Sequence, residues 1–512
     1  MHIIYVEKQI SVKGGPVSMK RSTTPSYIAQ YRLLCTPDDG KFIGHCLFLG
    51  CKTYNIMVGE ANKRLNSYYR DKEVNAIRMK QRKKGYELSD AEKDILKAKR
   101  KQYGLSEYAF QVYLKVHGKQ ISNFLDANTV QKIASQAWKG VSSVLFGKGK
   151  RLHYKKVEEF RSLEGKTNRQ GIRYDTKKGC LIWGSRRIPI QVRGNDKWAQ
   201  RALSDRVKYC RVVAKWHKTH WEYYLQLVLE GTSPTMAKPM SPNAEVGIDL
   251  GTSTVAITYD KKLDLRELGG EVNDIEAEIA RLDRKLDRQR RASNPQNYDK
   301  LGRIKRLKKG ERREWHYSQG YYKTFYLRRT LYAKRQAKLK QFHERLAEEV
   351  LSMGNQINVE RMSMAGLSKR SKKTKINPKM GRPYSKKRFG KSIANHAPSM
   401  FIEALTRKGK ARGATVTRYD PKPIKASQYD HTDGSNKKAP LSQREKTLSN
   451  GDKVQRDLYS AFLMKCLNAD GTISQYKCNR FYPEFKRMHD ELLAELRRQK
   501  AGGKKFPSCM GV

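Results

Sequence analysis

Apolar positions in the first half of the chain change their spacing twice. Alternating residues predict strands at 2–6 and 27–31, and apolar residues at helical spacing predict helices over 41–145. From 150 to 232 the alternation returns. It predicts two hairpins, the first joining 171–174 to 180–183 and the second joining 207–213 to 221–229 across a basic turn at 215–218.

The second half of the chain has a different pattern, which begins after a linker predicted at 233–243 by its three prolines. Strands interleave with helices there, and this order is typical of a mixed α/β domain. The predicted elements are a strand over 246–259, basic helices at 271–292 and 314–354, a strand at 357–360, a helix near 395–411, a strand at 414–419, an irregular insertion at 421–455 and a helix from Asp457.

The excess of basic over acidic residues indicates what kind of molecule the protein binds. The chain of 512 residues carries 107 Lys and Arg against 50 Asp and Glu, a formal net charge of +57. Self-repulsion on this scale destabilises a compact fold unless a polyanion neutralises it, so a long nucleic acid is the expected partner. A ribosomal or chromatin-like binder is the simpler alternative, although such proteins rarely need so long a folded chain.

Two further features bear on location. No run of about 18 apolar residues exists, so no membrane span is expected, and the alternating first 12 residues are unlike a signal peptide. The eight cysteines form no Cys-x-x-Cys pair. This favours reduced thiols and a cytoplasmic location over a disulfide framework.

Three acids stand out in so basic a chain. Asp249 lies in a strand between Gly247 and Gly251, which would leave room for an anion and a metal on that face. Glu360 ends the strand 357–360, and Asp457 opens a helix. The simpler alternatives are an exposed acid in a glycine-rich turn, an ordinary strand-terminal glutamate and a helix cap, respectively.

The chemistry of these acids suits a metal site. Two Mg²⁺ ions about 4 Å apart need carboxylates to hold them, and three carboxylates suffice because Mg²⁺ keeps several waters. Asp249, Glu360 and Asp457 are therefore the predicted metal ligands and catalytic residues. They are far apart in the sequence, so tertiary folding has to bring them together.

Their surroundings resemble the three RuvC motifs of the TnpB family of transposon-encoded nucleases and of the related miniature type V CRISPR effectors. The resemblance extends to a basic helix between the first two motifs and to a segment ahead of the third. The matching segments are 247–251, 358–360, 456–461, 282–291 and 413–428.

The resemblance implies an α/β fold, in which a β-rich wedge domain with an inserted helical recognition domain precedes an RNase H-like RuvC nuclease domain. It also implies a guide RNA, a short target-adjacent motif, target DNA cleaved on both strands, and an assisting arginine at Arg444. The implied divisions are wedge at 1–40, recognition at 41–148, wedge at 149–232, linker at 233–243, RuvC at 244–424, a zinc-ribbon-like insertion at 425–455, and RuvC with a C-terminal tail at 456–512.

The insertion departs from the family. Relatives carry two Cys-x-x-Cys pairs in this region, whereas residues 425–455 contain no cysteine and a single His431 among acids. This is a poor zinc site. We therefore expect no zinc and a loop held by other contacts.

Two segments are candidates for nucleic-acid contacts. Residues 368–391 contain eleven Lys and Arg and no acid, and we expect this loop to order on the guide–target duplex rather than remain a solvated segment. Residues 303–340 interleave aromatic rings with basic side chains, a mixture suited to stacking and phosphate contact, although several rings must pack the helix itself.

Guided cleavage is the leading hypothesis, and two alternatives stay open. A guided DNA-binding repressor would gain nothing from clustered acids near phosphates, so the intact triad argues against it. An unguided RNase H-fold transposase or resolvase would co-purify without a defined RNA.

Overall fold

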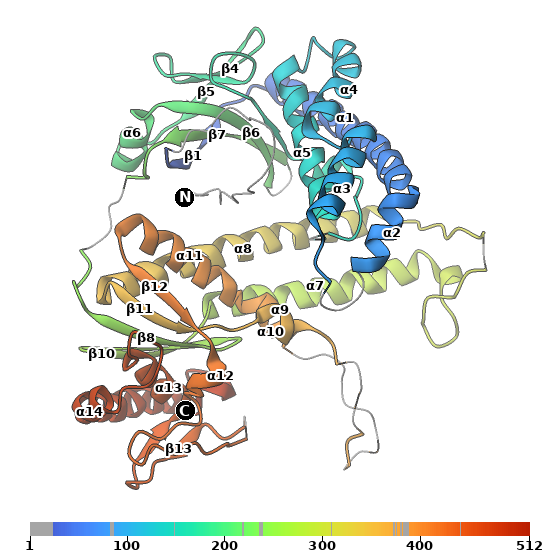
Figure 1. Cartoon of the computed structure of the whole chain (residues 1–512). Coiled ribbons are helices and arrows are strands. Elements are labelled where there is room, and N and C mark those ends of the chain that lie inside the picture. Colours follow the sequence, from blue (N-terminus) through green and yellow to red (C-terminus); the bar gives the residue numbers. More distant parts are fainter. Residues whose placement is uncertain are drawn as a thin grey trace. The chain divides into compact units, whose positions relative to one another are not determined.

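The computed structural model describes residues 24–81, 86–147, 149–217, 220–234, 239–308, 310–371, 374, 376–378, 381, 389–440 and 442–512. The strand expected at 2–6 lies outside them. The chain divides into two compact units, Met1–Met236 and Ala237–Val512, and each is described by itself (Figure 1). Helices and strands occur in both, so the expectation of a mixed α/β protein is confirmed.

The first unit contains a seven-stranded sheet in the order β2-β6-β7-β1-β5-β4-β3. Strand β1 pairs with both β7 and β5, so strands from before and after the helices belong to one sheet. The strands are β1 (Ser26–Leu33), β2 (Ser162–Glu164), β3 (Arg173–Asp175), β4 (Cys180–Trp183), β5 (Arg186–Gln191), β6 (Val207–His217) and β7 (His220–Glu230).

In the described part of the chain between β1 and β2, there are five α-helices. They are α1 (Pro37–Arg70), α2 (Lys72–Gln81), α3 (Asp90–Gln102), α4 (Glu107–Lys119) and α5 (Ala127–Leu145). Thr36 and Ser89 begin α1 and α3 with reciprocal capping boxes, which satisfy backbone N–H groups that a helix start leaves unpaired. One apolar core joins these helices to the sheet. A further short helix, α6 (Lys197–Leu203), was not expected.

One predicted hairpin is confirmed and the turn of the other is misplaced. Asp175 pairs with Cys180 across the β3–β4 turn, as expected. In the second hairpin the basic turn at 215–218 is wrong, because Lys215 pairs with Glu222 and the strand continues to His217. The rings of Trp216 and Trp221 face each other edge-on with centroids 5.2 Å apart, and such aromatic cross-strand pairs stabilise a ladder.

The second unit contains a five-stranded mixed sheet in the order β10-β9-β8-β11-β12. The pairs β10–β9 and β9–β8 are antiparallel, and the pairs β8–β11 and β11–β12 are parallel. The strands are β8 (Glu245–Leu250), β9 (Thr254–Tyr259), β10 (Lys262–Glu267), β11 (Gln356–Glu360) and β12 (Thr415–Tyr419). The single strand expected over 246–259 is wrong, because the Gly251 N–H donates to the Thr254 carbonyl at 2.9 Å and closes a turn.

Helices cover both faces of this sheet (Figure 1). Val246, Ile248 and Leu250 pack with α8 (Gln319–Met353) and α11 (Pro398–Arg412) on one face. Helices α13 (Arg456–Lys465) and α14 (Gln475–Ala501) pack on the other face, where Ala256 joins their core.

The second unit contains further helices and strands. They are α7 (Asn273–Ala292), α9 (Met364–Ser368), α10 (Gly390–His396), α12 (Pro421–Ile424), β13 (Glu445–Thr447) and β14 (Lys453–Gln455). Among the described residues, we find no helix with the length and apolar character needed to cross a membrane. The eight cysteines all lie in the described part of the chain as free thiols.

Candidate functional site

Asp249 and Glu360 lie on the same face of the sheet, at the ends of neighbouring parallel strands. Ile248 pairs with Val359, and each acid is the next residue of its strand. Both neighbours point into the core shared with α8 and α11, so alternation directs the acids to the opposite face. Asn358, two residues before Glu360, donates to the Met464 carbonyl of α13 at 3.1 Å, which confirms that this face meets α13.

Asp457 reaches this face from the first turn of α13. The cap of the helix is Gln455, whose side chain accepts from the Leu458 N–H at 2.7 Å. Asp457 is therefore not the helix cap. Its carboxylate is left to face Arg444, with Nη1 3.7 Å from Oδ2, and Arg456, with Nε 3.6 Å from Oδ1.

Asp457 and Glu360 lie close enough to Asp249 for their charges to act on its carboxyl group. Burial raises the pKa of Asp249 well above its usual range, and the charges of Asp457 and Glu360 raise it further. Arg456 and Arg444 oppose this rise. Burial also raises the pKa of Glu360. The structure thus brings together all four residues predicted from the sequence.

This donor set fits divalent cations. Neighbouring carboxylates that raise the pKa of Asp249 carry negative charge that a cation would neutralise, and carboxylate oxygens are the ligands that Mg²⁺ prefers. Asp249, Glu360 and Asp457 are the residues that would hold such ions.

The glycine beside Asp249 has a different role from the one expected. A Cβ at Gly247 would lie 2.0 Å from the Ala461 carbonyl oxygen and 2.3 Å from the Lys465 nitrogen. Gly247 therefore allows α13 to pack against β8, rather than leaving room for a metal. Ala461 is likewise fully buried in this contact, so the helix face at that residue is packed and not open.

An open pocket of about 400 Å³ lies beside Glu360. It is lined by Glu360, Pro421, Lys422, Lys425, Ala426, Ser427 and Gln428. The end of the matching segment 413–428 thus lies next to the second acid. Its two lysines supply positive charge of the kind that phosphates require.

Hydrogen bonds hold the cysteine-free insertion. The buried Asp430 carboxylate accepts from the Thr432 N–H at 3.0 Å and from the Ser449 N–H at 2.8 Å, and so bridges two parts of the loop. The neighbouring His431 bonds through Nδ1 to the Tyr459 hydroxyl of α13 at 2.7 Å. The loop is thereby attached to the helix that carries Asp457.

Aromatic and basic side chains share the surface of α8, as the sequence predicted. Tyr317 stacks on Tyr321 with centroids 4.4 Å apart, whereas Tyr322 is 43% exposed and Tyr332 39% exposed. Trp315 packs under the guanidinium of Arg290, so this ring supports the protein itself. In the basic loop 368–391, residues 372–373, 375, 379–380 and 382–388 lie outside the described residues.

Sequence reasoning missed a second cluster. Among the described residues, three metal-ligating side chains whose ligand atoms all lie within 4.8 Å of one another occur at His217, His220 and Glu222, and not at the three acids. The signal was present as His-x-x-His-x-Glu, but the misplaced turn at 215–218 hid it.

No family model matches this chain, and no curated protein does. Solved structures to which this chain is similar include the following two. One is a cryo-EM structure of a Cas12f1–sgRNA–target DNA complex, at 11% identity over 88% of this chain and 99% of that chain, with a TM-score of 0.42. The other is a cryo-EM structure of a CRISPR-Cas12f ternary complex, at 12% identity over 85% of this chain and 82% of that chain, with a TM-score of 0.27.

Proposed function

We propose that this protein is an RNA-guided DNA endonuclease with a Mg²⁺-dependent RuvC-type site in an RNase H-like domain. The observation that carries the proposal is the meeting of Asp249, Glu360 and Asp457 on the α13 face of the mixed sheet, in a chain of net charge +57. A protein that only binds phosphates has no use for clustered carboxylates beside its basic surface.

The residues of the site divide into metal ligands and supporting arginines. Asp249, Glu360 and Asp457 would hold two Mg²⁺ ions, which would supply an activated water and charge stabilisation at the leaving oxygen. Arg444 faces Asp457 and can contact a phosphate once metals neutralise that carboxylate. Arg456 is a positioning residue, because its guanidinium donates to the Gln443 carbonyl at 3.1 Å and ties the insertion to α13.

The proposed partners are a guide RNA and the target DNA. The net charge and the exposed tyrosines of α8 suit a heteroduplex held by its backbone and shape. Guidance itself follows from the resemblance to TnpB-like nucleases and miniature type V effectors. In the same way, the first unit would supply the wedge and recognition functions that read a short target-adjacent motif.

We further propose that the insertion at 425–455 works without zinc. The Asp430 contacts to Thr432 and Ser449, and the His431 contact to Tyr459, join segments that a zinc ion would otherwise join.

The test is Asp249→Asn in the full chain with its co-purified RNA. Cleavage of a matched DNA in Mg²⁺ should be lost, while RNA and DNA binding persist, because the substitution removes a metal ligand and leaves the basic surfaces intact. Asp274→Asn is the matched control. It makes the same charge change at an exposed acid of α7, and this variant should cleave DNA normally.

The outcomes separate the alternatives. Full cleavage by Asp249→Asn would overturn the site. A wild-type complex that binds guided DNA without ever cutting it would favour the repressor, and cleavage without any bound RNA would favour the unguided nuclease.

A further inference from the structure

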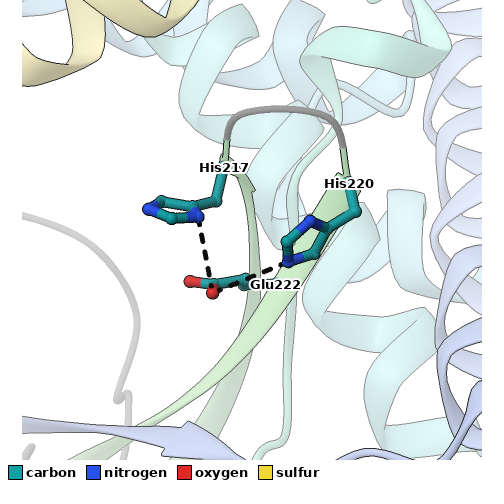
Figure 2. A group of neighbouring side chains, drawn as sticks. All are labelled: His217, His220 and Glu222. Carbon is teal, nitrogen blue, oxygen red and sulfur yellow. Dashed lines mark ion pairs between the residues drawn. The ribbon is translucent and has the colours of Figure 1, made fainter.

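The β6–β7 hairpin places three metal-ligating side chains on one face of its end. His217 and His220 are directly paired across the strands, and Glu222 is the second residue after His220. Paired residues share a face, and so do residues two apart on one strand. Figure 2 shows both imidazole rings directed at the Glu222 carboxylate.

The spacing of the ligand atoms fits a single tetrahedral ion. Glu222 Oε1 lies 3.7 Å from His217 Nδ1 and 3.8 Å from His220 Nε2. Two ligand atoms bound about 2.1 Å from a tetrahedral ion are about 3.4 Å apart, so both distances from Glu222 are within a few tenths of an ångström of this value. The three ligand atoms all lie within 4.8 Å of one another. The imidazole side chains are 52% and 57% exposed, which gives an ion access from solvent.

The carboxylate is already oriented by its neighbours. The Tyr224 hydroxyl donates to Glu222 Oε2 at 2.7 Å. Arg32 Nη2 lies 3.0 Å from Oε1. A carboxylate oxygen has two lone pairs, so Oε1 can face both the guanidinium and an ion. Such supporting contacts hold metal ligands in place.

We propose that His217, His220 and Glu222 form a binding site for a borderline divalent metal, best represented by Zn²⁺, that ties together the ends of β6 and β7. Two imidazoles and a carboxylate select Zn²⁺ over Mg²⁺ and leave a fourth position for water or an external ligand. The site belongs to the first unit. It differs from the cysteine-free insertion, to which the expectation of no zinc applied, and it does not depend on the proposed nuclease activity.

The test is a Zn²⁺ titration of the chelator-stripped full chain by calorimetry, with excess Mg²⁺ present to occupy carboxylate sites. His217→Ala, His220→Ala and Glu222→Gln should each weaken the tightest binding step by about tenfold or more. His153→Ala, which removes an exposed imidazole elsewhere in the first unit, should leave that step unchanged. Equal affinity in all four variants and the wild type would overturn the site.

A second measurement locates the ion. Zn²⁺ should slow amide hydrogen exchange at Trp216 and Trp221, beside the paired histidines, in the wild type but not in His220→Ala, because a bound ion links the two strands at that end. Protection that appears equally in His220→Ala would also overturn the proposal.

Discussion

At Gly247, strand β8 and helix α13 approach so closely that a single methyl group would clash with backbone atoms. We predict that Gly247→Ala lowers the free energy of unfolding by about 1–3 kcal/mol, the usual cost of overpacking. Cleavage should fall as well, because Asp249 lies on β8 and Asp457 on α13. Urea unfolding and a cleavage assay measure the two effects.

Gly194→Ala is the matched control for this substitution. A Cβ at Gly194 would meet no atom within 4 Å, so the variant should be as stable and as active as the wild type. If Gly247→Ala behaved like Gly194→Ala, the close packing of α13 on β8 would be refuted.

At the scale of elements, α8 meets α10 through a buried histidine. His343 is fully buried, and its Nε2 is 2.8 Å from the His396 carbonyl that ends α10. Burial lowers the pKa of His343 to about 4. In the unfolded chain, His343 has an ordinary pKa of about 6.5, so as the pH falls this histidine is protonated in the unfolded state before it is protonated in the folded state. The contribution of neutral His343 to the stability of the folded state is therefore complete above pH 6.5 and is lost between about pH 6.5 and 4.

The corresponding prediction compares two histidines. Between pH 7 and 5 the wild type should lose about 2 kcal/mol of stability through this group, and His343→Met should not show that part of the loss. Urea unfolding at several pH values measures the difference. His153→Met, at an exposed site, should keep the wild-type slope. The same slope in His343→Met as in the wild type would show that this histidine is not held neutral.

For the whole molecule, the net charge of +57 has a direct thermodynamic consequence. Neutralising many phosphates releases condensed counterions, so the affinity for a guide or target duplex should fall at least about 1000-fold between 50 and 200 mM salt. Filter binding across this range measures the slope. Asp249→Asn should show the same slope, because the proposed role of the Asp249 carboxylate is to bind metal and not phosphate. A flat response in the wild type would contradict a large duplex-binding surface.

The sequence by itself determined the net charge of this protein and the kinds of element that carry its three candidate acids. The net charge follows directly from the amino-acid composition. The acids at 249, 360 and 457 could be assigned to two strands and a helix because apolar alternation and helical spacing are local patterns. The same patterns predicted the helices at 273–292 and 319–353 to within a few residues at either end.

Only the tertiary structure decided which residues meet. The division of 246–259 into two strands, the strand at Lys262–Glu267 and the extension of β6 to His217 depend on pairing between segments, which local spacing does not specify. The role of Gly247 depends on a helix more than two hundred residues away. The metal-ligating cluster at His217, His220 and Glu222 likewise follows from strand register, since moving a turn by one residue changes the face to which every side chain points.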